Sequence, residues 1–159
     1  MGLESQLSLG AYVSVDTPSE QIYDMIYDRP GPYLIFLNGS IVGYGSDEVV
    51  GIVRSARRSG QISKDVSVTK DDATVCIPNI CIRTSSGRIC RPLYTLPKKP
   101  CEGMTFTQML SEGVVEYLDV YEEDTMLIGE THEEIDPSLM LGFLQEPQCI
   151  AAETPRPRK

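Results

Sequence analysis

Apolar positions along the chain follow first a strand pattern and then a helical pattern. Two apolar runs, YLIF and IVGY, flank Asn38 and Gly39, and this dipeptide is the strongest short-range signal for a β-hairpin. In the next stretch, SDEVVGIVRSARRSG, the apolar side chains form one stripe. Ser46 or Asp47 can cap its start, and Gly60 ends it. The pattern predicts an amphipathic helix of about 12 residues.

From residue 64 to residue 96 the apolar period changes to two. This segment predicts three strands, with turns near Asp71-Asp72 and Ser86-Gly87. Its two prolines cannot donate to a strand ladder, so each marks an edge position, a bulge or a strand end. The first half of the chain is therefore expected to contain a hairpin, a helix and antiparallel strands.

The second half predicts a shorter set of elements. The run TFTQMLSE is expected to form a helix capped by Thr105 and ended by Gly113, and VVEYLDVYEEDTMLIGE then predicts a strand, an acidic turn and a strand. The Pro-rich residues 143–159 predict a flexible tail. The chain is thus predicted to be α+β, with two small mixed subdomains at residues 33–96 and 97–142 and a disordered C-terminal tail.

Charge and hydropathy narrow the classes of function. The 159 residues carry a formal net charge of −9, whereas a freestanding nucleic-acid binder has a basic face. Any contact with DNA or RNA is therefore expected to be local or supplied by partner chains. No apolar run reaches the ~18 residues of a membrane helix, and the N-terminus lacks the basic-then-apolar order of a signal peptide. We expect an intracellular protein that is neither secreted nor in a membrane.

The cysteines and the single histidine do not predict a metal or catalytic site. The cysteines are Cys76, Cys81, Cys90, Cys101 and Cys149. They form no C-x-x-C pair, and His132 lies far from them in sequence, so the four ligands of a structural zinc are not in place. We expect reduced thiols that serve as small buried hydrophobes. His132 has no nucleophile near it in sequence, and no catalytic, cofactor-binding or metal-ligating residue is predicted.

A dense acidic group is the strongest chemical feature of the chain. Its members are Glu116, Asp119, Glu122, Glu123 and Asp124. Carboxylates can bind a hard cation, but the alternation and internal glycine of a calcium loop are missing. In a strand, Glu116 and Asp119 point to opposite faces, so the five acids do not converge. The favoured interpretation is charge pairing or a solvated surface.

The segment GRICRPLY has basic side chains that could pair with this group. Arg88 and Arg91 are three residues apart and so lie on opposite faces of a strand. A phosphate loop would need more glycines at a helix start than the one at Gly87. Arginine forms forked bonds to carboxylates, so we expect Arg88 or Arg91 to bond an acidic residue. The candidates for structural ion pairs are Arg88, Arg91, Glu116, Asp119, Glu122 and Glu123.

A second basic group closes the predicted helix. Arg54, Arg57 and Arg58 could contact a phosphate backbone, which makes them weak nucleic-acid candidates. The favoured alternative is that they complement the negative end of the helix dipole.

Six short segments occur in a fixed order over about 140 residues. They are GLESQLSL, YLIFLNGSIVGY, RRSGQI, SSGRICRPLY, EGVVEYLDVYEEDTMLIG and THEEIDPSLMLG. This series resembles the second-largest, beta-like subunit of multisubunit DNA-directed RNA polymerases of the eukaryotic, archaeal and large-DNA-virus type. The residues that match its motifs are Asn38, Gly39, Gly43, Arg57, Arg58, Gly60, Ile62, Gly87, Arg88, Arg91, Pro92 and Leu93. Ser5 and Gln6 stand where the family has lysine and asparagine, and Glu133 and Asp136 stand where it has cysteine and histidine.

The resemblance implies a particular division of the chain. Residues 1–32 are similar to the end of the fork region, 33–96 to the first external region and 97–142 to the second, with 143–159 as a divergent flexible tail. The lobes, most of the fork and the hybrid-binding domain would lie outside this chain. The Mg and Zn ions of a full polymerase are likewise expected outside this segment, so no cofactor is expected here.

The resemblance also implies a role. The chain would be a structural fragment that supports RNA synthesis from ribonucleoside triphosphates on a DNA template and is inactive alone. Its partners would be other polymerase subunits or fragments, especially the fork and hybrid-binding segments and the largest subunit, and it would meet DNA only through the complex. It would work in the nucleus in a cellular eukaryote, or in host cytoplasm or virion in a virus. The alternative is a freestanding acidic adaptor that binds a basic protein partner.

Overall fold

The computed structural model describes residues 10–72, 77–95, 102–126, 128–129 and 149–151. Residues 149–151 are described by their backbone alone. These residues form helices and strands in mixed order, which confirms the predicted α+β class. His132 and the four departures from the family motifs lie outside the described residues.

One sheet is built from the hairpin and two later strands. Its order is β3-β2-β5-β4, with β2 at Tyr33–Leu37, β3 at Ser40–Gly45, β4 at Ser67–Asp71 and β5 at Asn79–Arg83. Strands β4 and β5 are antiparallel, as the sequence predicts, but β5 runs parallel to β2. The sheet is therefore mixed and not wholly antiparallel. The chain brings β5 to β2 only after a helix and β4 have intervened, which a local pattern does not indicate.

The predicted hairpin turn is confirmed. Asn38 and Gly39 have φ values of 50° and 86°, the left-handed pair that a tight two-residue hairpin requires. The Asn38 amide also donates to the Thr84 hydroxyl (2.9 Å) and accepts from the Thr84 N–H (2.8 Å). The turn is thereby fixed to the far end of β5.

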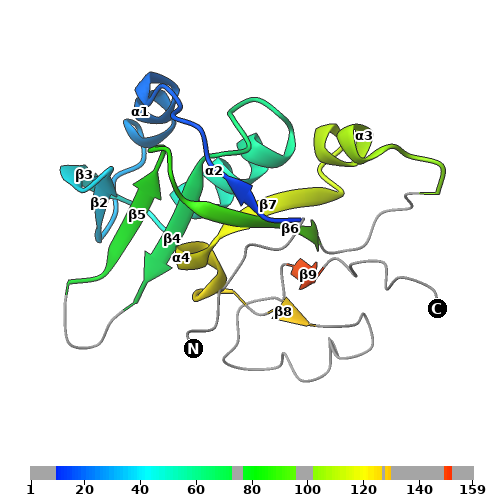
Figure 1. The fold of residues 1–159 in the computed structure, drawn as a ribbon. Coiled ribbons are helices and arrows are strands. Elements are labelled where there is room, and N and C mark those ends of the chain that lie inside the picture. Colours follow the sequence, from blue (N-terminus) through cyan, green and yellow to red (C-terminus); the bar gives the residue numbers. More distant parts are fainter. Residues whose placement is uncertain (1–9, 73–76, 96–101, 127, 130–148, 152–159) are drawn as a thin grey trace, which may run out of the picture.

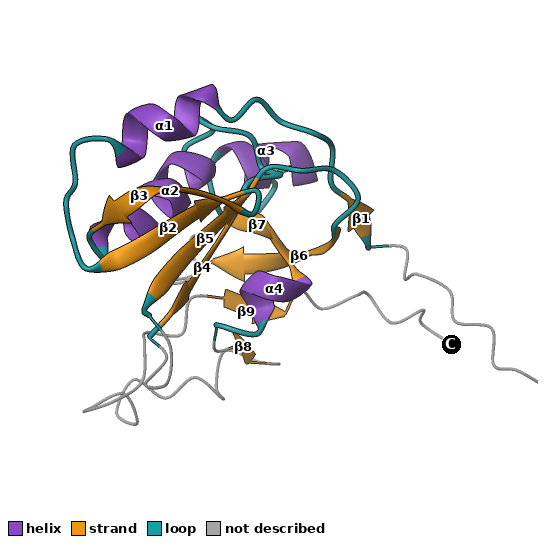
Figure 2. Cartoon of the chain, turned by 90° about the vertical axis from the view of Figure 1, so that its left-hand side faces the viewer, coloured by secondary structure: helices purple, strands orange, loops and turns teal. Residues whose placement is uncertain are grey.

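Two helices cover one face of this sheet (Figure 2). They are α1 at Glu20–Ile26 and α2 at Glu48–Arg58, and the second matches the predicted amphipathic helix. Their buried side chains meet those of the strands in one apolar core. Its members include Ile22, Ile26, Ile35, Leu37, Val49, Val53, Val68, Ile80 and Ile82. Helix α1 is absent from the sequence prediction because its seven residues show the apolar spacing for only two turns.

The start of α2 lacks the side-chain capping hydrogen bond that the sequence predicts. Asp47 occupies the cap position, but its side chain makes no capping hydrogen bond and lies 2.8 Å from the ammonium group of Lys70 on β4. The carboxylate therefore links the helix start to the sheet edge.

A second sheet lies beside the first (Figure 1). It contains β1 at Tyr12–Val13, β6 at Ile89–Thr95, β7 at Val115–Asp119, β8 at Ile128–Gly129 and β9 at Cys149–Ala151. Strand β6 pairs with β7 along one edge and with β1 and then β9 along the other. The sequence predicts β6 as one of three successive strands with β4 and β5, but the structure pairs β6 within the second sheet. The pleated pattern identifies a strand but not its partners.

Two local features of the second sheet follow from single residues. Pro92 lies inside β6, between the residues that pair with β1 and those that pair with β9. The missing N–H thus coincides with a break in the ladder on that edge. Strand β9 lies within the segment predicted as a flexible tail, and the remainder of residues 143–159 is outside the described part of the chain.

Two short helices flank β7. Helix α3, at Phe106–Ser111, begins at the predicted cap: the Thr105 hydroxyl accepts from the Gln108 N–H, and the Gln108 side chain accepts from the Thr105 N–H. The predicted acidic turn is helix α4, at Val120–Glu123. Among the described residues, no helix has the length and apolar composition to span a lipid bilayer.

Gly113 ends α3 where the chain passes close to the end of α2. Its φ is +64°, and a Cβ atom there would lie 2.7 Å from the Arg58 carbonyl oxygen. We predict that Gly113→Ala lowers the free energy of unfolding by about 2 kcal/mol, from left-handed strain and this contact.

Chemical unfolding of the full chain measures this effect. Gly51→Ala is the matched control, because Gly51 is within α2 and a Cβ atom there meets nothing within 4 Å. The control should stabilise the chain by up to ~1 kcal/mol. A Gly113→Ala protein as stable as the parent would contradict the predicted crowding.

Candidate functional site

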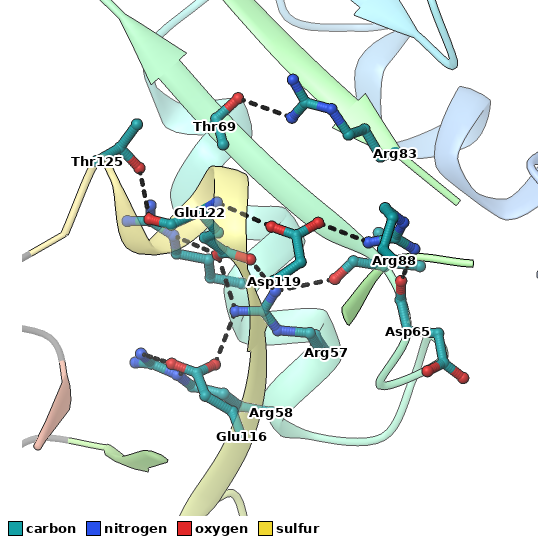
Figure 3. Close-up of polar contacts among 12 residues, drawn as sticks. Arg57, Arg58, Asp65, Thr69, Arg83, Arg88, Glu116, Asp119, Glu122 and Thr125 are labelled. Carbon is teal, nitrogen blue, oxygen red and sulfur yellow. Dashed lines mark hydrogen bonds and ion pairs between the residues drawn. The ribbon is translucent and has the colours of Figure 1, made fainter. Parts of the chain in front are cut away.

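The end of α2 carries a buried arginine that two carboxylates enclose (Figure 3). Arg57 donates from Nη1 to Glu122 Oε2 (2.7 Å) and from Nη2 to Glu116 Oε2 (2.8 Å). Nη1 also donates to the carbonyl of Val66 (2.9 Å). Arg57, Glu116 and Glu122 are all buried. A charged group without water is stable only when it is paired and hydrogen-bonded, and these contacts meet that need at both Nη atoms, whereas the buried Nε donates to none of the described residues.

Two further arginines of α2 approach the same carboxylates. Arg58 binds Glu116 with two bonds, from Nε to Oε2 (3.1 Å) and from Nη2 to Oε1 (2.7 Å), which is the forked geometry that suits a carboxylate. Arg54 Nε lies 3.4 Å from Glu122 Oε1. The three guanidinium groups and two carboxylates form one cluster between the two sheets, which we call the α2–β7 network.

These contacts engage the basic helix end, whose arginines the sequence offers as weak nucleic-acid candidates. The side chains of Arg54 and Arg57 are only 9% and 2% exposed, and both face carboxylates. Arg58 is 28% exposed and engages Glu116. The Arg57 guanidinium points to β7 and α4, while Arg57 and Arg58 both lie in the last turn of α2, at the negative end of the helix dipole.

A second buried ion pair lies on the other side of β7. Arg88 donates from Nη1 to Asp119 Oδ2 (2.8 Å) and from Nε to the Ser85 carbonyl (2.8 Å), and Nη2 donates to the Asp65 carbonyl. Asp119 Oδ1 accepts from the N–H of Glu122 (2.8 Å) and so caps α4. Asp119 therefore connects Arg88 to the helix that aims Glu122 at Arg57.

Arg91 and Glu123 form an ion pair of a different kind. Arg91 Nε lies 2.5 Å from Glu123 Oε1, but the Arg91 side chain is 48% exposed. Water screens such a pair, so its contribution to stability is small. The structure thus brings both arginines of GRICRPLY to the acidic group, one in the interior and one at the surface.

Within β7, the members of the acidic group point alternately to the two faces of the strand, as expected. Glu116 and Asp119 lie on opposite faces of β7, toward Arg57 and toward Arg88. Glu122 then returns to the Glu116 side because the chain turns into α4, and a strand pattern carries no sign of that turn. Asp124 is exposed. The pairing of Arg54, Arg57 and Arg58 with these acids is the feature that sequence reasoning missed.

Electrostatics favour the ionised forms within the network. Burial alone would raise the pKa of Glu116, but the attraction of Arg57 and the hydrogen bond from Arg58 lower that pKa from 4.5 to about 2. Burial would likewise lower the pKa of Arg57, yet Glu122 and Glu116 hold it above its usual value. Burial is the largest effect on Arg54 and lowers its pKa.

The lowered pKa of Glu116 makes the free energy of unfolding depend on pH in the acidic range. A carboxylate whose folded pKa lies below its unfolded pKa stabilises the fold above the unfolded value, and this stabilisation is lost as the pH falls toward the folded value. We predict a loss of about 3 kcal/mol from Glu116 between pH 4.5 and pH 2, on the basis of roughly 1.4 kcal/mol per pKa unit.

Urea unfolding at a series of pH values measures this loss. Glu116→Gln should flatten the profile over that range, whereas Glu123→Gln, at a partly exposed carboxylate, should leave its slope unchanged. A parent profile as flat as that of Glu116→Gln would refute the assignment.

The thiols of the described residues lack the features of reactive groups. Cys90 is buried and Cys81 half-buried, and both are free. Burial, with the negative charge of Asp119, raises the pKa of Cys90 to about 11, which disfavours the thiolate. Among the described residues, no three His, Cys, Asp or Glu side chains gather in a way that could hold a metal.

The fold and the site therefore define a class: two small α+β domains joined by buried ion pairs. Two family models match the chain, "RNA polymerase Rpb2, domain 4" over residues 35–96 and "RNA polymerase Rpb2, domain 5" over residues 106–154. The chain belongs to the family of second-largest subunits of DNA-directed RNA polymerase and forms part of such a subunit.

Curated relatives agree with the family models. The chain is 34% identical to DNA-directed RNA polymerase III subunit rpc2 of Dictyostelium discoideum, over 79% of this chain and 9% of the relative. It is 26% identical to DNA-directed RNA polymerase II subunit RPB2 of Schizosaccharomyces pombe, over 98% of this chain and 16% of the relative. The chain is 31% identical to DNA-directed RNA polymerase III subunit RPC2 of the same yeast, over 89% of this chain and 15% of the relative. The chain thus spans about a tenth to a sixth of the length of these relatives.

The α2–β7 network joins the two matched domains. Helix α2 lies in the residues that match domain 4, whereas Glu116 and Glu122 lie in those that match domain 5. The pairing of β6 with β7 crosses the same boundary. The two domains therefore share buried charges as well as a sheet.

Proposed function

We propose that this chain is a structural part of a polymerase second-largest subunit, which holds two domains of that subunit in a fixed arrangement. It would support RNA synthesis from ribonucleoside triphosphates on a DNA template without supplying a catalytic residue. The observation that carries the proposal is the α2–β7 network, because its buried charges connect the two domains that the family models match.

The chemistry of the described side chains supports a structural role. Phosphoryl transfer depends on metal ions and positioned phosphates. The basic groups that could hold phosphates at this site, Arg54, Arg57 and Arg88, are buried against Glu122, Glu116 and Asp119. We propose that Mg and Zn are bound elsewhere in the polymerase and that this chain has no cofactor.

Partners and location follow from the same proposal. The other polymerase subunits, including the largest subunit and the fork and hybrid-binding segments of this one, would surround the two domains. DNA would be met only through the assembled complex. The relatives are named as subunits of RNA polymerases II and III from eukaryotes, which favours the nucleus for a cellular protein. A viral protein would act in host cytoplasm or in the virion.

The competing adaptor role depends on a free acidic surface. In the acidic group of residues 116–124, three of the five acids are buried and already paired with arginines, namely Glu116, Asp119 and Glu122. Glu123, which pairs with Arg91, and the exposed Asp124 are the members of the group that a basic partner could reach. The burial therefore favours the structural role over the adaptor.

Co-purification tests the proposal. The tagged full chain would be co-expressed with the flanking segments of a related second-largest subunit and with the largest subunit, and RNA synthesis would be assayed for the chain alone and for the assembly. We expect the segments to co-purify with the chain and the chain alone to make no RNA. Binding to polylysine but to none of the segments would favour the adaptor, and RNA synthesis by the chain alone would overturn the proposal.

A further inference from the structure

A groove lies between α1 and α2, on the side of these helices that faces away from the sheet. Its volume is about 1080 Å³, and its floor is formed by the apolar side chains of Met25, Ile52 and Ala56. None of the five residues of the α2–β7 network lines it. The groove is thus a separate surface of the chain.

One wall of the groove is built from small residues of α2. Gly51, Ser55 and Ser59 are spaced four apart, so they lie one above another along the helix, and all three are exposed. Glycine inside a helix is less stable than alanine. A Cβ atom at Gly51 would meet nothing within 4 Å, so no contact of the described residues requires glycine at this position. The wall therefore carries no side chain at this position.

The rim of the groove is acidic. Asp24 on α1 and Glu48 on α2 line it, and Glu20 at the start of α1 and Asp28 just after its end are exposed. Arg29 is the one basic side chain among the described lining residues, and it donates from Nη1 to the Met25 carbonyl (2.9 Å). The rim therefore suits a partner with positive charge on its flanks.

We propose that this groove binds a helix of another polypeptide, one with a stripe of small and aliphatic residues and with lysine or arginine on both sides of that stripe. Small residues at a helix contact let the two axes approach closely. The 11 residues of α2 span about 16 Å, so roughly three turns of the partner would lie in the groove. This proposal does not depend on the polymerase role, because any chain of this chemistry would fit.

A synthetic helical peptide provides the test. The probe is a fluorescent peptide of about 16 residues, with alanine and leucine on one face and lysine on both flanks, titrated with the full chain and followed by anisotropy. We expect saturable binding that weakens as salt is added. Gly51→Leu should weaken binding at least tenfold, while its melting temperature stays at or above that of the parent. Ser111→Leu, on α3 outside the groove, should bind as the parent does.

A second peptide and the oligomeric state complete the test. A peptide with glutamate in place of each lysine should not bind, and restoring its binding by Asp24→Lys with Glu48→Lys would support the charge argument. Failure of the lysine peptide to bind, or equal binding by Gly51→Leu, would overturn the proposal. A dimer of the parent chain that Gly51→Leu dissociates would also overturn it, because the occupant would then be a second copy.

Discussion

Replacing Arg57 with methionine is expected to lower the free energy of unfolding of the chain by about 3–5 kcal/mol, the cost of leaving a buried charge without its partner. Arg57 contributes bonds to both Glu116 and Glu122, and Glu122 is 0% exposed, so water cannot replace the lost contacts. Equilibrium unfolding in urea, followed by circular dichroism, measures the change.

A double-mutant cycle separates this effect from a simple loss of packing. Glu122→Gln should destabilise the parent strongly but cost much less in the Arg57→Met background, because the buried charge that it removes has by then lost its bonds to Arg57 and retains only the 3.4 Å contact with Arg54. Additive effects of the two substitutions would show that Arg57 and Glu122 do not interact energetically.

Arg88→Leu is expected to cost about 3 kcal/mol, whereas Arg91→Leu should cost less than ~1 kcal/mol. Arg88 directly precedes β6 and Arg91 lies within it, and each pairs with one acid, so they form a matched comparison. The Arg88 and Asp119 side chains are 8% and 1% exposed, and Asp119 also caps α4. The exposed pair of Arg91 and Glu123 has neither property.

Thermal unfolding of the two variants distinguishes the pairs. Arg88→Leu should melt well below the parent, and high salt should leave its deficit unchanged because the pair is shielded from the solvent. Equal melting temperatures for the two variants would contradict the assigned difference in burial, and unchanged melting in both would refute a structural role for the arginines of GRICRPLY.

The elements that the sequence predicts best are those with local causes. The turn at Asn38-Gly39, the α2 stripe and the Thr105 cap depend on residues within one or two turns of each other, and all three are present in the structure. The parallel pairing of β2 with β5 and the transfer of β6 to the second sheet depend on contacts between distant residues. A period of two is the same for every strand and does not encode these partners.

The ion pairs of the candidate site could likewise be predicted only in part, because they also depend on contacts between distant residues. The sequence identifies the acidic group and Arg88 as residues for ion pairs, but it treats Arg54, Arg57 and Arg58 as a surface feature of a helix end. Their burial arises only because β7 and α4 close over α2, 58–68 residues further along the chain. No pattern within α2 itself indicates that carboxylates from distant residues will cover its arginines.

We infer that the buried charges make the two matched domains one cooperative unit, and native-state hydrogen exchange can detect this cooperativity. Amide exchange would be compared between the full chain and Arg57→Met for β2 and β5 of the first sheet and for β6 and β7 of the second. We expect the amides of both sheets to open with one common free energy, which falls by the same amount in the variant. A loss of protection in β6 and β7 that leaves β2 and β5 unchanged would contradict it.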